Sequence, residues 1–403
     1  MSVRIAGTGS CLVDNLYSPV DFSSQQFTGY CSKANGDVGL VPGQLVFGED
    51  LERFSGCEYS TILSELTGGA APVSVNIGGP CIAALINLQC LLHNSDTFIA
   101  FYGHRGNDSN GDFLVNRLQA TGLDLSNYTS QSGITPFTDV LSDPQYHNGH
   151  GERTFVHYMG LAGEYSMKHI PDSFFDADIY VYGGTGILPE LHAQLSDLLK
   201  KGKKSCGLNF VNTVYDFKNQ QKNPDKPWPL VRDPDDFKLI DLLIMDNEEA
   251  LRISGTSDAG SALAFFRKEG VHACVITNGP GLITAFSDGS LCRKTDMLEM
   301  PVLTVAGEWM NAPQAHGDTT GCGDNFAGGV MASIAAQIQR THPGALSLED
   351  AISWGAASGG FACTYMGGVY AEQEPGEKLE KIRQAHVLYR EQTGDHLSIR
   401  DIL

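Results

Sequence analysis

The chain has 403 residues, of which 42% are hydrophobic and 18% charged, so it can bury a sizeable core and does not have the composition of a disordered chain. Its formal net charge of −20 disfavours nucleic acid and anionic membranes as partners, and no apolar run reaches the roughly 18 residues that a membrane-spanning helix needs. Ten cysteines without a C-x-x-C pair indicate free thiols rather than a zinc site or a disulfide framework, so we expect a cytoplasmic protein.

Short apolar runs alternate with helical patterns along most of the chain. Strands are expected at 3–7, 178–184, 241–245 and 273–279, and helices at 82–92, 112–121, 188–201, 247–253 and 260–269. Strands that are buried on both faces and followed by helices are typical of an α/β fold with a doubly wound, mostly parallel sheet. The ligands of such sheets bind beyond the carboxyl ends of the strands.

Two regions interrupt this alternation. Residues 16–65 are rich in glycine, serine and aromatic side chains, and residues 134–160 read as two strands joined by a polar loop. We expect a single domain over residues 1–403 in which these two regions form a small β-sheet lid. Exposed lid strands often pair with another chain, which leaves a homodimer open. A proline-rich stretch at 212–234 is expected to be a surface insertion.

The segment Asp318-Thr-Thr-Gly-Cys-Gly-Asp324 carries the clearest chemistry. It precedes a helix whose apolar side chains recur every four residues, at Phe326, Val330, Ile334 and Ile338. A helix N-terminus offers unpaired N–H groups and the positive end of the helix dipole, which suit an anion. Gly321 and Gly323 let a phosphoryl group approach the backbone, and Asp324 could accept the proton of an attacking hydroxyl. An aspartate at a helix start is most often a simple N-cap, but the complete run is much more specific than that.

This run resembles the C-terminal signature of the ribokinase-like (PfkB) carbohydrate kinases. The resemblance implies that Asp324 is the catalytic base and that Gly321, Cys322 and Gly323 form an anion hole. It also implies ATP and Mg²⁺ as cofactors and a monovalent cation such as K⁺ at Asp318. Cys322 stands where the family usually has alanine or glycine, and a small thiol is tolerated because the anion hole uses backbone N–H groups. No Walker-type G-x-x-x-x-G-K-[ST] motif occurs, so phosphate binding must use the glycine turn.

Segments in the first half of the chain resemble the family's acceptor site. The turn after the first strand contains Asp14, which matches the aspartate that binds substrate hydroxyls, although alone it would read equally well as a turn residue. A glycine pair before a helix lets a substrate approach the backbone. The family usually has an asparagine five residues after the first of these glycines, but this chain has Ala83, so the acceptor is held differently or is not a typical ribose or fructose derivative. An arginine in the second lid strand could reach an anionic substrate group, although such a side chain is usually only solvated. The residues expected at the acceptor are Asp14, Asn15, Gly78, Gly79 and Arg153.

The second half of the chain resembles the family's nucleotide side. Asp246-Asn-Glu-Glu249 stands at the motif that organises water and Mg²⁺ around the phosphates; Glu249 matches it, and Asp246 replaces an asparagine. An acidic first helical turn is also favourable by itself. The residues expected at the nucleotide are Thr277, Gly279, Gly281 and Gly359.

We therefore expect an ATP-dependent kinase that phosphorylates a hydroxyl of a small metabolite, with a sugar as the preferred acceptor. A nucleoside kinase is the nearest alternative, because residues 39–45 and 76–79 faintly resemble adenosine kinases and lid aromatics could stack on a base. A non-catalytic ligand sensor on the same fold is a third alternative, and the presence of Asp324 argues against it.

Overall fold

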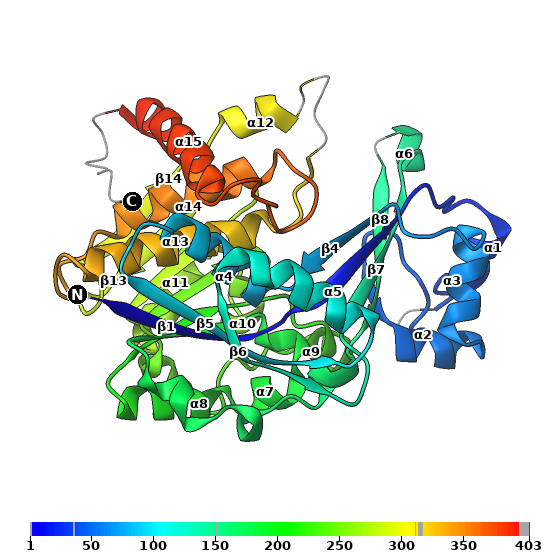
Figure 1. Ribbon diagram of the computed structural model, residues 1–403, viewed down its shortest axis with the longest axis horizontal. Coiled ribbons are helices and arrows are strands. Elements are labelled where there is room, and N and C mark those ends of the chain that lie inside the picture. Colours follow the sequence, from blue (N-terminus) through cyan, green and yellow to red (C-terminus); the bar gives the residue numbers. More distant parts are fainter. Residues whose placement is uncertain (1, 35–36, 150, 311, 313–316, 395–402) are drawn as a thin grey trace.

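The computed structural model describes residues 2–34, 37–149, 151–310, 312, 317–394 and 403. Within them, a large sheet of nine strands lies beside a smaller sheet of five (Figure 1). The strand order of the large sheet is β14 (Thr295–Met300), β13 (Ile283–Ser287), β12 (Ala273–Thr277), β11 (Leu242–Asp246), β10 (Leu208–Asn212), β9 (Ile179–Gly183), β1 (Val3–Gly9), β5 (Thr97–Gly106) and β6 (Asp124–Gln131).

The large sheet is parallel from β6 to β12 and antiparallel only at its β13 and β14 edge. Its central strands are buried on both faces, because alternate side chains enter two separate cores. Val181 of β9 packs in one core, and its neighbours Tyr180 and Tyr182 pack in the other. This arrangement confirms the predicted doubly wound α/β sheet.

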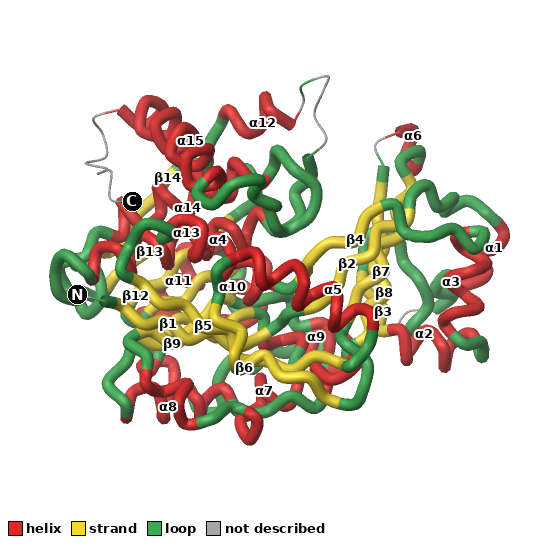
Figure 2. Tube along the Cα trace, in the orientation of Figure 1, coloured by secondary structure: helices red, strands yellow, loops and turns green. Residues whose placement is uncertain are grey.

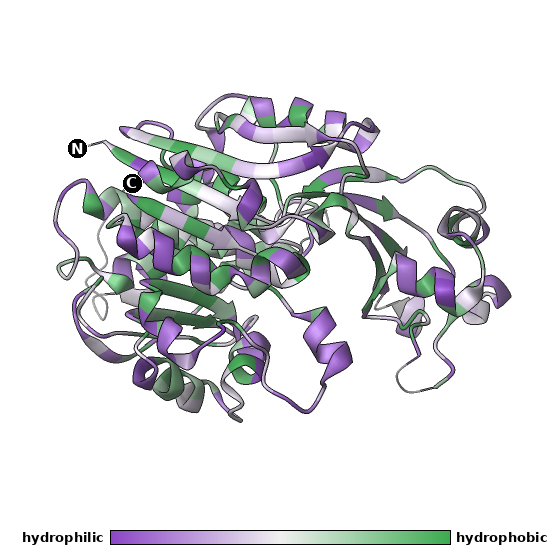
Figure 3. Cartoon of the chain, turned by 90° about the horizontal axis from the view of Figure 1, so that it is seen from below, coloured by the Kyte–Doolittle hydropathy of each residue, from purple (hydrophilic) through white to green (hydrophobic). Residues whose placement is uncertain are grey.

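Helices cover both faces of this sheet, as Figure 2 shows. One layer contains α4 (Pro80–Leu91), α5 (Ser109–Leu118), α13 (Cys322–Ile338), α14 (Leu348–Ala362) and α15 (Glu377–Thr393). The other contains α7 (Pro189–Ala193), α8 (Leu195–Lys204), α10 (Asn247–Ser254) and α11 (Ala259–Lys268). Hydrophobic colour is concentrated on the strands between the two layers (Figure 3). Among the described residues, no helix is long and apolar enough to cross a membrane.

The smaller sheet forms the lid. Its strand order is β3 (Leu45–Phe47), β8 (Glu152–Tyr158), β7 (Phe137–Asp143), β2 (Leu12–Tyr17) and β4 (Ser74–Gly78). The sheet therefore uses more of the chain than the two regions expected for it, since β4 and the start of β2 lie outside them.

The lid has its own core on its outer face. Alternate strand residues, among them Tyr17, Leu141 and Val156, pack there against Phe27 and Ile62 of the added helices. These helices are α1 (Gln25–Tyr30), α2 (Gly48–Ser55) and α3 (Tyr59–Thr67). They cover the outer face of the lid sheet, whose edge strands are β3 and β4, and pairing of lid strands in a homodimer stays a prediction.

The stretch at 212–234 differs from the surface insertion that its prolines indicate. It contains α9 (Phe217–Lys222), and Trp228 is only 3% exposed. The Trp228 ring lies 4.7 Å from that of Tyr215, and its Nε1 donates a hydrogen bond of 3.1 Å to Gln220. The stretch thus folds back on the sheet, and part of it lines the cleft described below.

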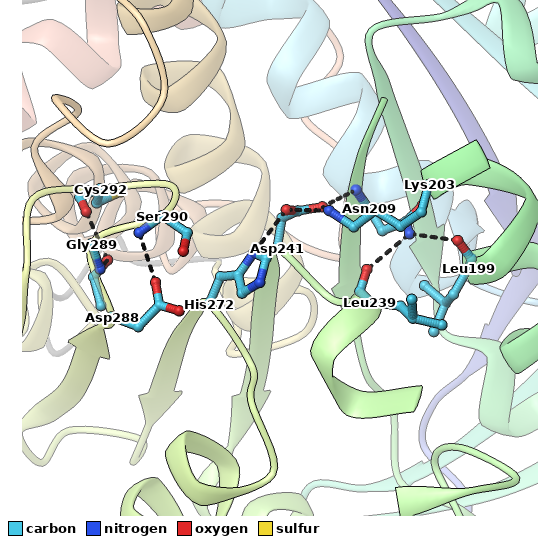
Figure 4. Close-up of polar contacts among 11 residues, drawn as sticks. Leu199, Lys203, Asn209, Leu239, Asp241, His272, Asp288, Gly289, Ser290 and Cys292 are labelled. Atoms are coloured by element: carbon cyan, nitrogen blue, oxygen red, sulfur yellow. Dashed lines mark hydrogen bonds and ion pairs between the residues drawn. The ribbon is translucent and has the colours of Figure 1, made fainter. Parts of the chain in front are cut away.

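A buried carboxylate joins three strands at the edge of the sheet opposite that cleft (Figure 4). Asp241, directly before β11, accepts hydrogen bonds from Lys203 Nζ at 2.6 Å and from the backbone N–H of Asn209 at 2.7 Å. His272 Nδ1, directly before β12, lies 3.0 Å from the same carboxylate. These contacts anchor the amino ends of β10, β11 and β12.

Candidate active site

A cleft of about 1010 Å³ separates the lid from the carboxyl edge of the large sheet. It is lined by residues that lie far apart in the sequence. Asp14 and Arg153 come from lid strands, Gly79 precedes α4, and Asp318 and Asp324 flank the glycine turn before α13. The structure therefore brings the predicted base and most of the predicted acceptor residues to one place.

The glycine turn ends at the first residues of α13. Gly321 is the N-cap, with φ of +73°, and a side chain there would clash with Gly368. The helix begins at Cys322, whose N–H donates a hydrogen bond of 3.3 Å to the Thr319 carbonyl. The N–H groups of Gly323 and Asp324 follow in the first turn, where no intrahelical carbonyl is available to them. Apart from its two chain neighbours and the nearby backbone of its own helix, no described atom lies within 4 Å of the position where Gly323 would carry a Cβ. The turn thus leaves room for an anion beside N–H groups, as expected for an anion hole.

Cys322 contributes its backbone to this turn, while its side chain points elsewhere. The Cys322 Sγ lies 3.3 Å from Cys363 Sγ at the end of α14. Gly359 lies one turn before Cys363, and a Cβ there would be 3.0 Å from the Cys322 carbonyl oxygen. Gly359, which we expected at the nucleotide, therefore permits the close packing of α14 on α13.

Two carboxyl groups in the cleft have raised pKa values. Burial raises the pKa of Asp324 to about 6. Burial, and then the charge of Asp324, raise the pKa of Asp14 to about 7, although a hydrogen bond from Thr138 acts in the opposite direction. A carboxylate with a pKa near neutrality is well matched to proton abstraction from a hydroxyl.

Asp14 and Asn15 are adjacent in β2 but face opposite sides of the lid sheet. A side chain at Gly78 would clash with the carboxyl group of Asp14, so Gly78 provides the space that this group occupies. Gly79 has φ of +105°, which favours glycine, and lines the cleft. Asn15 instead donates a hydrogen bond of 2.9 Å to Asp139 and is not among the described residues that line the cleft. Asn15 therefore does not lie at the acceptor side of the lid, where we expected it. The reason is that successive side chains of a strand point to opposite faces of the sheet.

Ala83 stands where the resemblance would place an asparagine. It is 1% exposed and lies beside the loop at Gly367 and Gly368. Asn76, which pairs with Asp14 across β4 and β2, does line the cleft. An amide side chain is therefore present near Asp14, but it comes from a different strand.

Arg153 connects the lid to the glycine turn. Its Nη2 lies 3.1 Å from Asp318 Oδ2, and its Nη1 donates a hydrogen bond of 3.0 Å to Thr320. The other carboxylate oxygen of Asp318 accepts hydrogen bonds from the backbone N–H groups of Thr320 and Gly367, at 2.9 and 3.3 Å. A guanidinium group thus binds the carboxylate at which we expected a monovalent cation.

Asp246 and Glu249 form a capping box at the start of α10. The Asp246 carboxylate accepts a hydrogen bond of 2.8 Å from the Glu249 N–H, and Glu249 accepts from the Asp246 N–H and from the Thr213 hydroxyl. Burial and the charge of Asp246 raise the pKa of Glu249. It is the adjacent Glu248 that lines the cleft. Among the described residues, no group of three His, Cys, Asp or Glu side chains is arranged to hold a metal ion.

The other residues expected at the nucleotide lie along the same edge of the sheet. Thr277 ends β12 next to Asp246, and the turn that follows contains Gly279, with φ of +51°, and Gly281. Among the described residues that line the cleft, these three do not occur. Their role at a nucleotide stays a prediction.

Comparison with known proteins decides the family. The model of the pfkB family carbohydrate kinases matches residues 45–374. The chain belongs to this family. It is 23% identical over 336 residues to the 2-dehydro-3-deoxygluconokinase of Bacillus subtilis (strain 168), covering 78% of this chain and 87% of that protein.

Solved structures show the same fold as this pfkB-family kinase. The adenosine kinase from Schistosoma mansoni in complex with 2-fluoroadenosine has a TM-score of 0.67 and 16% identity, covering 91% of this chain and 97% of that one. A putative ribokinase II from E. coli, in complex with ATP and Mg²⁺, has a TM-score of 0.62 and 16% identity, covering 97% and 100%. The predicted ribokinase-like fold and carbohydrate kinase membership are confirmed, and the chain is a phosphotransferase that uses an alcohol group as acceptor.

Sequence reasoning missed several residues of this kinase's cleft. Thr138 and Val140 lie on the same face of β7, and Leu16 lies two residues after Asp14 on β2. Leu16 could have been found by taking every second residue of β2 from Asp14, whereas Thr138 and Val140 share its face through the pairing of Asp14 with Thr138, which the sequence does not show. Thr320, which binds Arg153, lies within the run from Asp318 to Asp324, but no role was expected for its side chain.

Proposed function

We propose that this kinase transfers the γ-phosphoryl group of ATP to a hydroxyl group of a neutral, polyhydroxylated metabolite, with a sugar as the first candidate. The observation that carries the proposal is the presence of Asp324, the open glycine turn and Asp14 in one cleft. Asp324 accepts the proton of the acceptor hydroxyl, whose oxygen then bonds to the γ-phosphorus as the bond from phosphorus to the ADP oxygen breaks. N–H groups of the turn at 321–323 face the charge that develops on the phosphoryl oxygens.

Mg²⁺, bound together with ATP, would neutralise phosphate charge during transfer. Asp246 and Glu249, on either side of the cleft-lining Glu248, are the residues that would hold it through water. We do not extend the proposal to K⁺ at Asp318, because the guanidinium group of Arg153 and two backbone N–H groups already bind that carboxylate.

The charge of the cleft supports a neutral acceptor. Arg153 is the single basic side chain among the described lining residues, and it is paired with Asp318. The acidic lining residues are Asp14, Asp37, Asp50, Glu248, Asp318 and Asp324. A sugar acid would have to place its carboxylate in this negative field, and the described lining residues offer it no unpaired basic side chain. We therefore do not transfer the gluconate substrate in the Bacillus relative's name to this chain.

A nucleoside is the second candidate, because the lid side of the cleft is largely apolar. The apolar lining residues of the lid include Leu16, Val46, Phe47, Val140 and Phe155. A purine or pyrimidine ring could pack on this surface while its ribose hydroxyls bind Asp14.

A panel of neutral sugars, sugar acids and nucleosides, assayed for ADP release with MgATP, tests both candidates. We expect turnover with a neutral sugar or a nucleoside and none with the acids. On the best acceptor, Asp324→Asn should lower kcat by about 10²- to 10⁴-fold, whereas the exposed Asp225→Asn should leave it unchanged. Phosphoryl transfer by purified Asp324→Asn at a near wild-type rate would refute the proposed role of this residue, and preference for a sugar acid would refute the neutral acceptor.

A further inference from the structure

A fully buried lysine lies directly behind the glycine turn. Lys378 of α15 is 0% exposed, and its Nζ donates a hydrogen bond of 2.7 Å to Asn325 Oδ1. The ammonium group also lies 5.8 Å from the centre of the Tyr365 ring. It forms no ion pair with a carboxylate among the described residues. Asn325 is itself 0% exposed and directly follows Asp324.

The amide of Asn325 joins the two glycine loops at the phosphoryl end of the cleft. Its Nδ2 donates hydrogen bonds of 2.8 Å to the carbonyl oxygens of Gly321 and Gly368. Its Oδ1 accepts from Lys378 and, at 3.2 Å, from the Tyr365 hydroxyl. An ammonium group can only donate, so Lys378 requires the oxygen of the amide to face it and directs the NH₂ group to the two carbonyls. Lys378 and the two carbonyl oxygens thus favour the same orientation of the amide that ties Gly321 to Gly368, and Lys378 supplies the charged donor that holds its oxygen.

Stability does not explain a charge in this place. Burying an ammonium group without a paired carboxylate is unfavourable, and an apolar side chain of similar length would fill the space without that cost. Burial lowers the pKa of Lys378 to about 8, while Cys90 and Glu372 act in the opposite direction. A positive charge behind an anion-binding turn does become favourable when negative charge develops there during phosphoryl transfer.

We propose that Lys378 is a positioning residue for phosphoryl transfer: through the Asn325 amide, its ammonium group holds the Gly321 turn in the arrangement that receives the transferring phosphoryl group. This inference rests on the proposed function. It adds a residue from the C-terminal helix that touches neither ATP nor the acceptor.

Lys378→Met separates this role from a structural one. The methionine fills the same space without a charge, so the melting temperature should be equal to or higher than that of the wild type. On the acceptor found with the panel, kcat should fall at least about tenfold, while the acceptor KM stays within about twofold. Lys381→Met is the matched control on the same helix. Lys381 is 42% exposed in its side chain and, among the described residues, its ion pair is with Glu377, so the substitution should change neither quantity.

An unchanged kcat in Lys378→Met would overturn the proposal. So would an unfolded variant, or a melting temperature that falls together with the rate, because either result would assign Lys378 a structural role. Asp324→Asn keeps the two proposals apart: if that variant retains wild-type rate, the proposed function fails, whereas a silent Lys378→Met with an inactive Asp324→Asn refutes only the role of Lys378.

The pH dependence of kcat gives a second measurement. Raising the pH through about 8 removes the positive charge of Lys378, so the wild-type kcat should fall above that pH. The other titratable groups that face the ammonium are Cys90, whose pKa is raised to about 12, Tyr365, whose pKa is also raised, and Glu372, which is acidic. In Lys378→Met this decline should be absent. A wild-type profile that stays flat well above pH 8, or a decline that persists in the variant, would overturn the proposal.

Discussion

Acidification should slow this kinase in two separable steps, because two carboxylates in the cleft have raised pKa values. Asp14 has a pKa of about 7 and Asp324 of about 6, both raised chiefly by burial. The reactive form needs both groups ionised, Asp324 to accept a proton and Asp14 to accept hydrogen bonds from the acceptor. On the acid side, activity is therefore lost as the pH falls through 7 and then 6. At pH 5 about 1 in 100 Asp14 groups and about 1 in 10 Asp324 groups are ionised, so kcat/KM should lie about 1,000-fold below its plateau.

Asp14→Asn removes the first step and leaves the second. Its plateau should be lower, because an amide accepts fewer hydroxyl hydrogen bonds, but between pH 8 and pH 5 its kcat/KM should fall only about tenfold. The assay is kcat/KM for the acceptor across this range, with ADP quantified directly so that no coupling enzyme limits the rate. Circular dichroism at each pH controls for unfolding. The same acid limb in Asp14→Asn and the wild type, or a wild-type limb that begins only near pH 4, would refute this reasoning.

Three further substitutions test other parts of the structure. Gly321→Ala, which places a methyl group against Gly368 at a positive φ, should lower kcat by on the order of 10²-fold, and near wild-type turnover would contradict the assigned turn geometry. Asp241→Ala should lower the free energy of unfolding by about 3–5 kcal/mol in urea titrations, because Lys203 loses its partner. It should not change kcat of the folded enzyme. A stability equal to that of wild type would show that the contact in Figure 4 contributes little. Asn15→Ala should leave the acceptor KM unchanged, since its side chain lies on the outer face of the lid, and a large rise in KM would place it in the cleft after all.

The parts of this structure that could be predicted are those marked by a pattern within one short stretch of the sequence. Apolar runs followed by helical patterns predicted the large sheet, and the run from Asp318 to Asp324 predicted the turn before α13. Asn15 was misplaced although the two-residue period of a strand places it opposite Asp14. The ion pair of Arg153 with Asp318 joins residues 165 positions apart, and nothing in either neighbourhood indicates the other. Composition alone also could not show that β4, which lies outside the two expected lid regions, completes the lid sheet.

The separate core of the lid has a consequence for how acceptor preference can change. The side chains that hold the lid together lie on its outer face, between the strands and α1–α3, whereas Leu16, Val140 and Phe155 lie on the inner face toward the cleft. Because alternate side chains of a strand lie on opposite faces, the outer face can be constrained by packing and the inner face by acceptor binding. Substitutions on the inner face can therefore change which metabolite the site binds without removing contacts of the lid core. Acceptor specificity in this kinase can thus change without loss of folding stability.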